Sequence, residues 1–164
     1  MILSKNFSKA ELCKSQTAIR MGLNNNPTDD QTENLRLLCE RVLQPVRDHF
    51  NQVVSISSGF RDPILSQKIG SSTKSQHCKG EAADLEIFGV SNNELADWIK
   101  ENLMFDQLIL EYHTPGEPNS GWVHVSYTKE INSNRKEYLM ATKNASGKTE
   151  YKQILGLSTD RYVK

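Results

Sequence analysis

Three short segments in the second half of the chain alternate between apolar and polar residues, and this period of two is typical of strands with two unlike faces. The segments are AADLEI (82–87), QLILEYH (107–113) and GWVHVSY (121–127). In each, one side is apolar and is expected to face the core: Ala83, Leu85, Ile87, Leu108, Leu110, Tyr112, Val123, Val125 and Tyr127. The opposite side then carries Asp84, Glu111 and His124, which converge if the strands are neighbours.

Helical spacing characterises the region before these strands. A capping box of Thr28 with Gln31 opens a helix to about residue 50, and its apolar stripe holds Leu35, Leu38, Cys39, Val42, Val46 and Phe50. Pro45 is expected to kink this helix or end it early. A second box, Ser91 with Glu94, precedes another amphipathic helix. Helices first and strands later predict an α+β fold, with helices on one face of a mainly antiparallel sheet.

Shorter elements complete the expected order. Ser8 can cap a short helix, VVSIS (53–57) is a strand, and a helix begins at Pro63 after Asp62 and stops at Gly70. The tail predicts a hairpin of KEYLMATK (136–143) and KTEYKQI (148–154) around NASG. The expectation is a single domain of 164 residues, with helices in 8–50, a sheet region in 53–128, and a hairpin and tail in 129–164.

Composition excludes several classes of function. Lysine plus arginine and aspartate plus glutamate each number 20, which gives no electrostatic argument for a nucleic-acid partner or an anionic membrane. No apolar run approaches the roughly 20 residues of a membrane span, and the start lacks the apolar core of a signal peptide. Three cysteines favour a reducing compartment over a disulfide framework. We therefore expect a monomer that is cytoplasmic as synthesised.

A histidine lies seven residues before the aspartate of the first strand, in SQHCKGEAADLEIF (75–88). His77, Asp84 and His124 would form a three-point ligand set for a borderline metal, with zinc the leading choice and a fourth position open for water. Small residues at 80, 82 and 83 would leave room for close packing. Alternatively, His77 is a solvated loop residue and Asp84 a strand-edge residue, because this spacing alone is not specific. Cys78 beside His77 leaves a thiolate ligand as a further option.

Three motifs resemble the M15 family of zinc D-alanyl-D-alanine peptidases. SQHCKGEAADLEI is similar to the family's Ser-x-His-x-x-Gly-x-Ala-x-Asp signature, and GWVHVS to its Trp-x-His signature. SSGFRDP resembles its Ser-Gly-Tyr-Arg segment, with Phe60 replacing the tyrosine. NFSKAEL and NLRLLCERVLQPVRDHF resemble the small single-domain branch common in phages and bacteria. The resemblance implies a hedgehog/DD-peptidase-like fold and a zinc ion held by His77, Asp84 and His124.

The resemblance also assigns roles to other residues. Arg61 would bind a substrate carboxylate or the oxyanion formed during attack. Ser75 would orient the loop or touch the substrate. Many family members carry an acidic general base three positions before the last histidine, where this chain has Gly121. The alternation argument makes Glu111 the replacement base, and His113 on the same face would assist it, contact substrate or lie at a loop mouth.

The function implied is hydrolysis of peptidoglycan stem peptides, either at terminal D-Ala-D-Ala or at L-Ala-D-Glu. A phage endolysin, made in the host cytoplasm and released to the cell wall, or a virion-associated enzyme would reconcile such a substrate with the absent signal peptide. Two alternatives stay open: a catalytically inactive zinc-containing module that binds the cell wall, which Gly121 favours, and a virion structural module. The last 30 or so residues carry no function that the sequence reveals.

Overall fold

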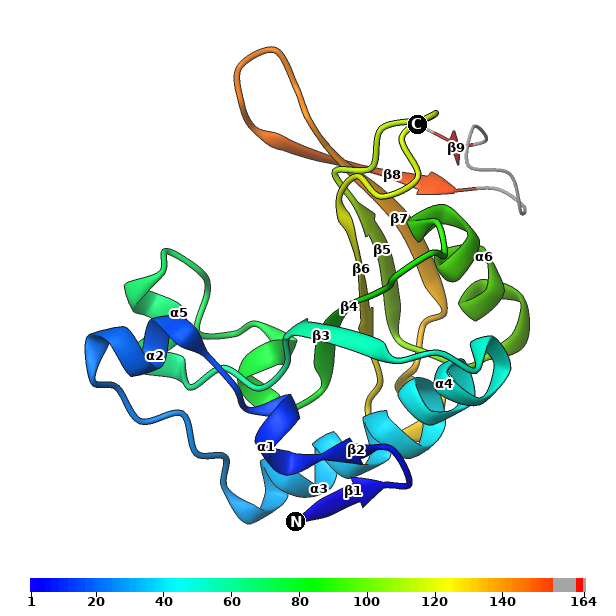
Figure 1. The fold of residues 1–164 in the computed structure, drawn as a ribbon. Helices are drawn as coiled ribbons and strands as arrows, with labels where there is room; N and C mark the ends of the chain where they lie inside the picture. Colours follow the sequence, from blue (N-terminus) through cyan, green and yellow to red (C-terminus); the bar gives the residue numbers. More distant parts are fainter. Residues whose placement is uncertain (155–161, 164) are drawn as a thin grey trace.

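A mixed sheet is the centre of the computed structural model, which describes residues 1–154 and 162–163 (Figure 1). Its strand order is β3-β4-β6-β5-β7-β8-β9. The strands are β3 Val54–Ser58, β4 Ala82–Ile87, β5 Gln107–Glu111, β6 Trp122–Ser126, β7 Glu137–Lys143, β8 Thr149–Ile154 and β9 Tyr162–Val163. All neighbouring pairs are antiparallel except β5 and β7, which run parallel. The prediction of an α+β fold with a mainly antiparallel sheet is confirmed.

Helices occupy the chain before and between the strands. The α-helices are α1 Lys9–Leu12, α2 Gln16–Met21, α3 Asp29–Leu38, α4 Gln44–Phe50, α5 Pro63–Lys68 and α6 Asn92–Asn102. Shorter turns are the π-helical η1 Cys39–Leu43 and the 3-10 helices η2 Gln76–Lys79 and η3 Ile131–Ser133. A two-stranded sheet of β1 Ile2–Ser4 and β2 Phe7–Ser8 precedes them. Neither this sheet nor α2 is among the elements predicted from the sequence.

The predicted helix starts rest on the expected side chains. Thr28 and Gln31 form a complete capping box, with the Gln31 amide 3.2 Å from the Thr28 hydroxyl and the Thr28 amide 2.8 Å from the Gln31 side chain. Ser91 accepts from the Glu94 amide at 3.3 Å, which is one half of the second box. Ser8 caps α1 as predicted.

The helix does not end early at Pro45, which corrects one of the two effects expected of this residue. It continues from α3 through η1 into α4, and Pro45 lies in the first turn of α4. The widened π-turn directly before the proline, closed by the Gln44 amide on the Cys39 carbonyl, accommodates a residue that has no N–H to donate. The helix ends instead at Asn51, which adopts a left-handed conformation.

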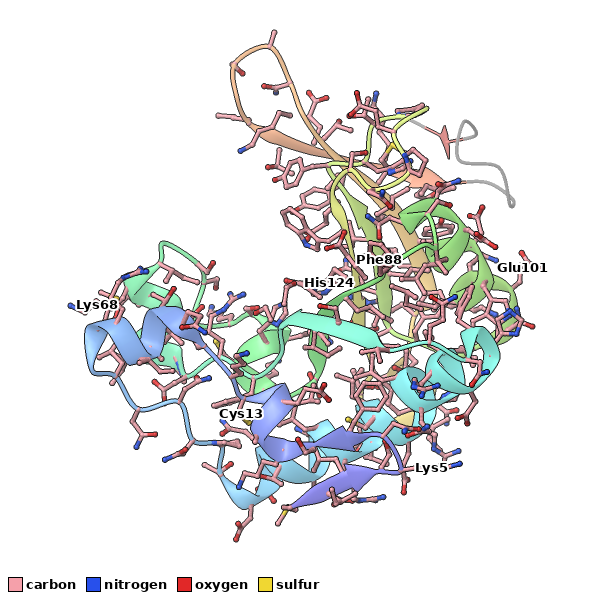
Figure 2. All side chains as sticks on the ribbon, viewed as in Figure 1. Lys5, Cys13, Lys68, Phe88, Glu101 and His124 are labelled. Carbon is pink, nitrogen blue, oxygen red and sulfur yellow. The ribbon has the colours of Figure 1, made fainter. Side chains whose placement is uncertain are left out.

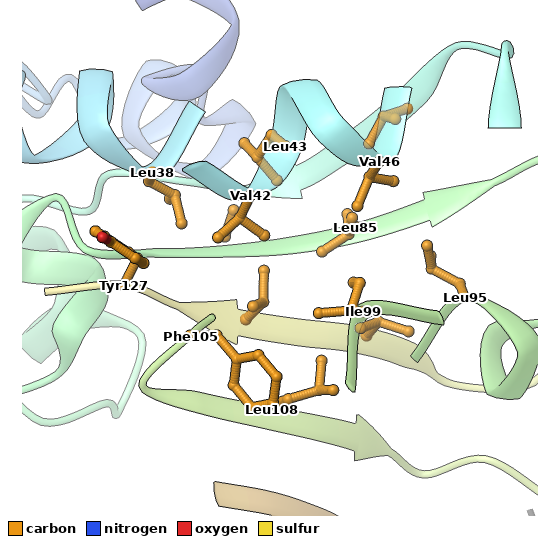
Figure 3. Packing of buried hydrophobic residues seen from close by; sticks show 14 of the residues in the cluster. Leu38, Val42, Leu43, Val46, Leu85, Leu95, Ile99, Phe105, Leu108 and Tyr127 are labelled. Carbon is orange, nitrogen blue, oxygen red and sulfur yellow. The ribbon is translucent and has the colours of Figure 1, made fainter. Parts of the chain in front are cut away.

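One apolar layer joins the helices to the sheet. Leu38, Val42, Leu43 and Val46 of the long helix and Leu95 and Ile99 of α6 pack against the strands (Figure 3). The residues predicted to face the core on β4, β5 and β6 are buried there: Ala83, Leu85, Ile87, Leu108, Leu110, Val123, Val125 and Tyr127. The other face of these strands is therefore free to form a site.

Tyr112 departs from the predicted alternation. Strand β5 ends at Glu111, and Tyr112 has a φ of 55°, so that the backbone turns and its side chain does not join the core. Its ring lies 5.4 Å from that of Trp122, which belongs to the opposite face. Within the described residues, no helix is long and apolar enough to cross a membrane.

Candidate functional site

Strands β4, β6 and β5 are consecutive in the sheet, which brings the predicted polar residues onto one surface. Asp84 is paired with His124, and His124 with Ile109. Glu111, two residues after Ile109 on the same face of β5, is paired with Trp122 of β6. Figure 2 shows His124 at the base of the region between α5 and the β7–β8 hairpin.

His77, Asp84 and His124 form a compact group. Each offers a ligand atom, and these atoms all lie within 4.8 Å of one another. Asp84 Oδ1 is 3.0 Å from His124 Nδ1 and 3.5 Å from His77 Nε2. Burial alone would raise the pKa of Asp84, but the adjacent His124 and His77 side chains hold it well below its usual value. Asp84 is therefore a carboxylate at neutral pH.

The backbone around His77 determines which of its nitrogens faces Asp84. His77 Nδ1 lies 2.8 Å from the carbonyl oxygen of Gly59, which can only accept, so Nδ1 carries the proton in the neutral ring. Nε2 then directs its lone pair toward the Asp84 carboxylate. A lone pair facing a carboxylate requires a cation between them or a second proton on the ring, and a carbonyl partner on the far nitrogen is the usual support of a metal-bound histidine. The donor set thus fits a metal ion.

Helix η2 positions His77 through two further contacts. Its cap residue Ser75 accepts from the His77 amide at 3.2 Å, and the Arg61 amide donates to the His77 carbonyl at 3.1 Å. Gly80 ends the helix with a φ of 74°, and a Cβ there would lie 2.4 Å from the Gln31 carbonyl oxygen. Only glycine allows this close approach of η2 to α3.

A cavity of about 470 Å³ contains this group. The residues that line it include His77, Asp84, His124 and Glu111, together with Arg61, Ser71, Ser72, Ser75, Trp122 and Tyr151. Arg61 Nη2 lies 3.3 Å from the Ser58 hydroxyl, and Arg61 also lines a second cavity of about 480 Å³ beside α2. The cavity therefore combines possible metal ligands, a further carboxylate and one arginine.

Glu111 differs from Asp84 in its electrostatic surroundings. Burial and the negative charge of Asp84 raise the pKa of Glu111, while His124, Trp122 and His77 oppose the shift. The indole N–H of Trp122 is buried and meets no acceptor with hydrogen-bond geometry, so its effect on Glu111 is that of a nearby dipole. A carboxyl group with a raised pKa beside a metal site is suited to accept and return a proton.

The backbone explains why residue 121 is glycine. Gly121 has a φ of 66°, and a Cβ there would overlap the Glu111 carbonyl oxygen and approach the Tyr112 carbonyl carbon to 2.7 Å. No side chain fits between β6 and the end of β5 at this point. Glu111 is the carboxylate that the structure brings into the cavity instead.

Three other residues considered from the sequence lie as follows. Ser75 lines the cavity and caps η2. His113 does not line it; this side chain is buried, with Nδ1 3.2 Å from the Ser120 carbonyl and 3.3 Å from its hydroxyl. The Cys78 thiol is buried 3.8 Å from the Ser72 carbonyl and is not in the ligand group. Sequence reasoning missed Tyr151, since no local pattern indicates that the tail hairpin reaches the cavity.

A family model described as Peptidase M15 matches residues 5–126. The match includes every candidate ligand, Arg61 and Glu111, and ends before the β7–β8 hairpin. No curated protein matches the chain.

Proposed function

The chain belongs to the peptidase M15 family, and from this we propose that it is a zinc-dependent peptidase that hydrolyses peptidoglycan stem peptides. The observation that carries the proposal is the His77, Asp84 and His124 group, which lies in the same cavity as Glu111 and Arg61. Family membership supports the class of reaction. The arrangement of the cavity supports the roles of its residues.

Zinc is the metal that suits this donor set. Two imidazole nitrogens and one carboxylate oxygen are ligands that zinc accepts in catalytic sites, where three protein ligands leave one position free. The ligand atoms of His77, Asp84 and His124 all lie within 4.8 Å of one another, so these three residues would hold one zinc ion together. When bound, zinc would polarise a peptide carbonyl and make a water molecule more acidic.

The protein's own side chains would perform the remaining tasks. Glu111 takes a proton from the attacking water and later gives it to the departing amine. Its raised pKa makes the protonated form easier to reach at neutral pH. Arg61 binds a carboxylate of the substrate, and the Gly59 carbonyl keeps the His77 ring oriented. Ser75 holds the backbone of η2 and lines the cavity.

Both candidate bonds have a carboxylate on the leaving residue, and Arg61 could bind it. In D-Ala-D-Ala the leaving residue carries the terminal carboxylate, and in L-Ala-D-Glu the leaving residue carries the free α-carboxylate of D-glutamate. Either bond therefore suits a cavity with one arginine in its wall. An endolysin that accumulates in the host cytoplasm and is released to the wall at lysis is the biological setting that we propose.

Mass spectrometry of purified stem peptides after incubation with the zinc-loaded protein tests this function. Cleavage should disappear with a chelator and in Glu111→Gln, and persist in Glu150→Gln, whose exposed side chain on β8 is outside the cavity. Binding of wall fragments without any cleavage would instead support a non-catalytic wall-binding module. The masses of the products identify the bond that is cut.

A further inference from the structure

The β7–β8 hairpin, which lies beyond the family match, supplies a side chain to the cavity. Tyr151 of β8 lines the same cavity as His77, Asp84, Glu111 and His124. It is also one of the large side chains left open to solvent, with 56% of its surface exposed. Figure 1 shows the hairpin (orange) rising from the sheet edge beyond β5.

Strand register explains how Tyr151 reaches the site. Trp122 is paired with Glu111, Glu111 with Ala141, and Ala141 with Tyr151. These four residues form one row across β6, β5, β7 and β8, and paired residues share a face of the sheet. Ala141 is fully buried and has the smallest side chain in the row. A tyrosine ring can therefore extend over it toward Glu111, about two strand spacings of 4.8 Å away.

Two contacts tie the hairpin to the end of β5. The hydroxyl groups of Tyr112 and Thr149 are 2.7 Å apart, and the Tyr112 amide donates to the Ala141 carbonyl at 2.8 Å. The Tyr112 ring also faces Trp122. Partial burial and the nearby Glu111 raise the pKa of Tyr151, in agreement with its place beside that carboxylate. The backbone that carries Tyr151 is thus anchored to the end of β5.

Charge is unequally distributed around the cavity. Among the lining residues, Arg61 follows β3, at one end of the strand order, whereas Trp122, Glu111 and Tyr151 lie on β6, β5 and β8, farther along the sheet. An anionic group of the substrate is attracted to Arg61 and repelled beside Glu111. Aromatic rings favour flat peptide groups and apolar side chains.

We propose that Tyr151 and Trp122 form a subsite for the uncharged residue on the acyl side of the scissile bond, while the carboxylate-bearing leaving residue lies toward Arg61. This inference rests on the proposed function and narrows its substrate class. An alanine precedes both candidate bonds, so the subsite would take an alanyl residue in either case. Tyr151 is then a specificity-determining residue contributed by the tail of the chain.

Peptide binding tests the subsite without turnover. The probe is L-Ala-γ-D-Glu-L-Lys-D-Ala-D-Ala, together with analogues in which the alanine before the cleaved bond is aspartate; both alanines are tested if neither bond is cut. Titration calorimetry with the zinc-loaded Glu111→Gln protein gives Kd; because this variant lacks the repelling carboxylate, its preference for alanine over aspartate reports the aromatic rings alone. Adding Tyr151→Ala should raise Kd for the parent peptide about fivefold to tenfold and abolish the preference for alanine over aspartate. Tyr151→Phe should keep both, because the ring makes the contact.

The control is Gln153→Ala, two residues along the same face of β8 and outside this cavity, which should leave Kd unchanged. An unchanged Kd and an unchanged alanine preference in Tyr151→Ala, with cleavage by the parent protein intact, would overturn the subsite and spare the peptidase. A peptide that binds through Tyr151 but is never cut would overturn the peptidase and spare the subsite. Circular dichroism confirms that each variant is folded.

Discussion

Gly121 provides the sharpest test of how this chain arranges its general base. The family's usual acidic residue can be restored at this position by Gly121→Glu, and Gly121→Ala introduces only the Cβ. Both should destabilise the protein and reduce hydrolysis. The reason is that the added Cβ would overlap the carbonyl oxygen of Glu111 and lie 2.8 Å from the His113 amide.

The expected loss of folding stability has two parts, and a second glycine in the chain allows them to be measured separately. A non-glycine residue at a φ of 66° costs about 1–2 kcal/mol, and forcing an atom into packed backbone adds about 1–3 kcal/mol. Gly121→Ala should therefore lower the free energy of unfolding by about 2–5 kcal/mol. Gly147 has a φ of 81° with nothing within 4 Å of its Cβ position, so Gly147→Ala should show the conformational part alone.

Urea unfolding of the wild type, Gly121→Ala and Gly147→Ala measures both parts. Hydrolysis measured with Gly121→Ala under native conditions should fall as well, since the displaced backbone carries Glu111. Equal stability of the two alanine variants would refute the steric argument. A Gly121→Glu protein that is stable and faster than wild type would refute the assignment of Glu111 as the base.

Three more outcomes follow from the site and the core. Glu111→Gln should lower kcat/KM by about 100-fold or more with zinc binding retained, as steady-state kinetics and zinc titration would show. Chelation should lower the melting temperature, by an amount equivalent to about 2.7 kcal/mol at a free zinc concentration 100 times Kd; no shift would argue against a metal site. Burial raises the pKa of Asp97 to about 6, so folding favours its protonated form and stability is lost as pH rises through that value. Asp97→Asn, which keeps an acceptor for the Tyr138 hydroxyl, should stabilise the protein at pH 8 and have little effect near pH 4, as urea unfolding would show.

Patterns of short range predicted much of this structure. Alternation over five to seven residues assigned the core and site faces of β4, β5 and β6, and the capping box predicted where α3 begins. The same argument failed at Tyr112, where a single positive φ turned the chain. The early helix end expected at Pro45 does not occur, because a π-turn, which has no sequence signature, precedes it.

Features that depend on pairing between strands far apart in the chain could not be predicted from the sequence. The parallel pairing of β5 with β7 joins residues about 30 positions apart, and hydrophobic periodicity does not specify a partner strand. That pairing alone brings Tyr151 into the row that contains Glu111. His113 was placed on the site face because alternation was extended too far along the chain. Strand β5 ends two residues earlier, at Glu111.

The two hydrogen bonds between His77 and the 59–61 turn have a thermodynamic consequence. The imidazole donates to Gly59, and the Arg61 amide donates back to the His77 carbonyl. An ion that immobilises the ring would thereby also restrict Arg61, the residue proposed to bind a substrate carboxylate, and linkage requires the effect to be mutual. Binding of the metal ion should increase the affinity for the substrate carboxylate, and binding of the carboxylate should increase the affinity for the ion by the same factor. The metal-free protein is therefore expected to bind substrate more weakly.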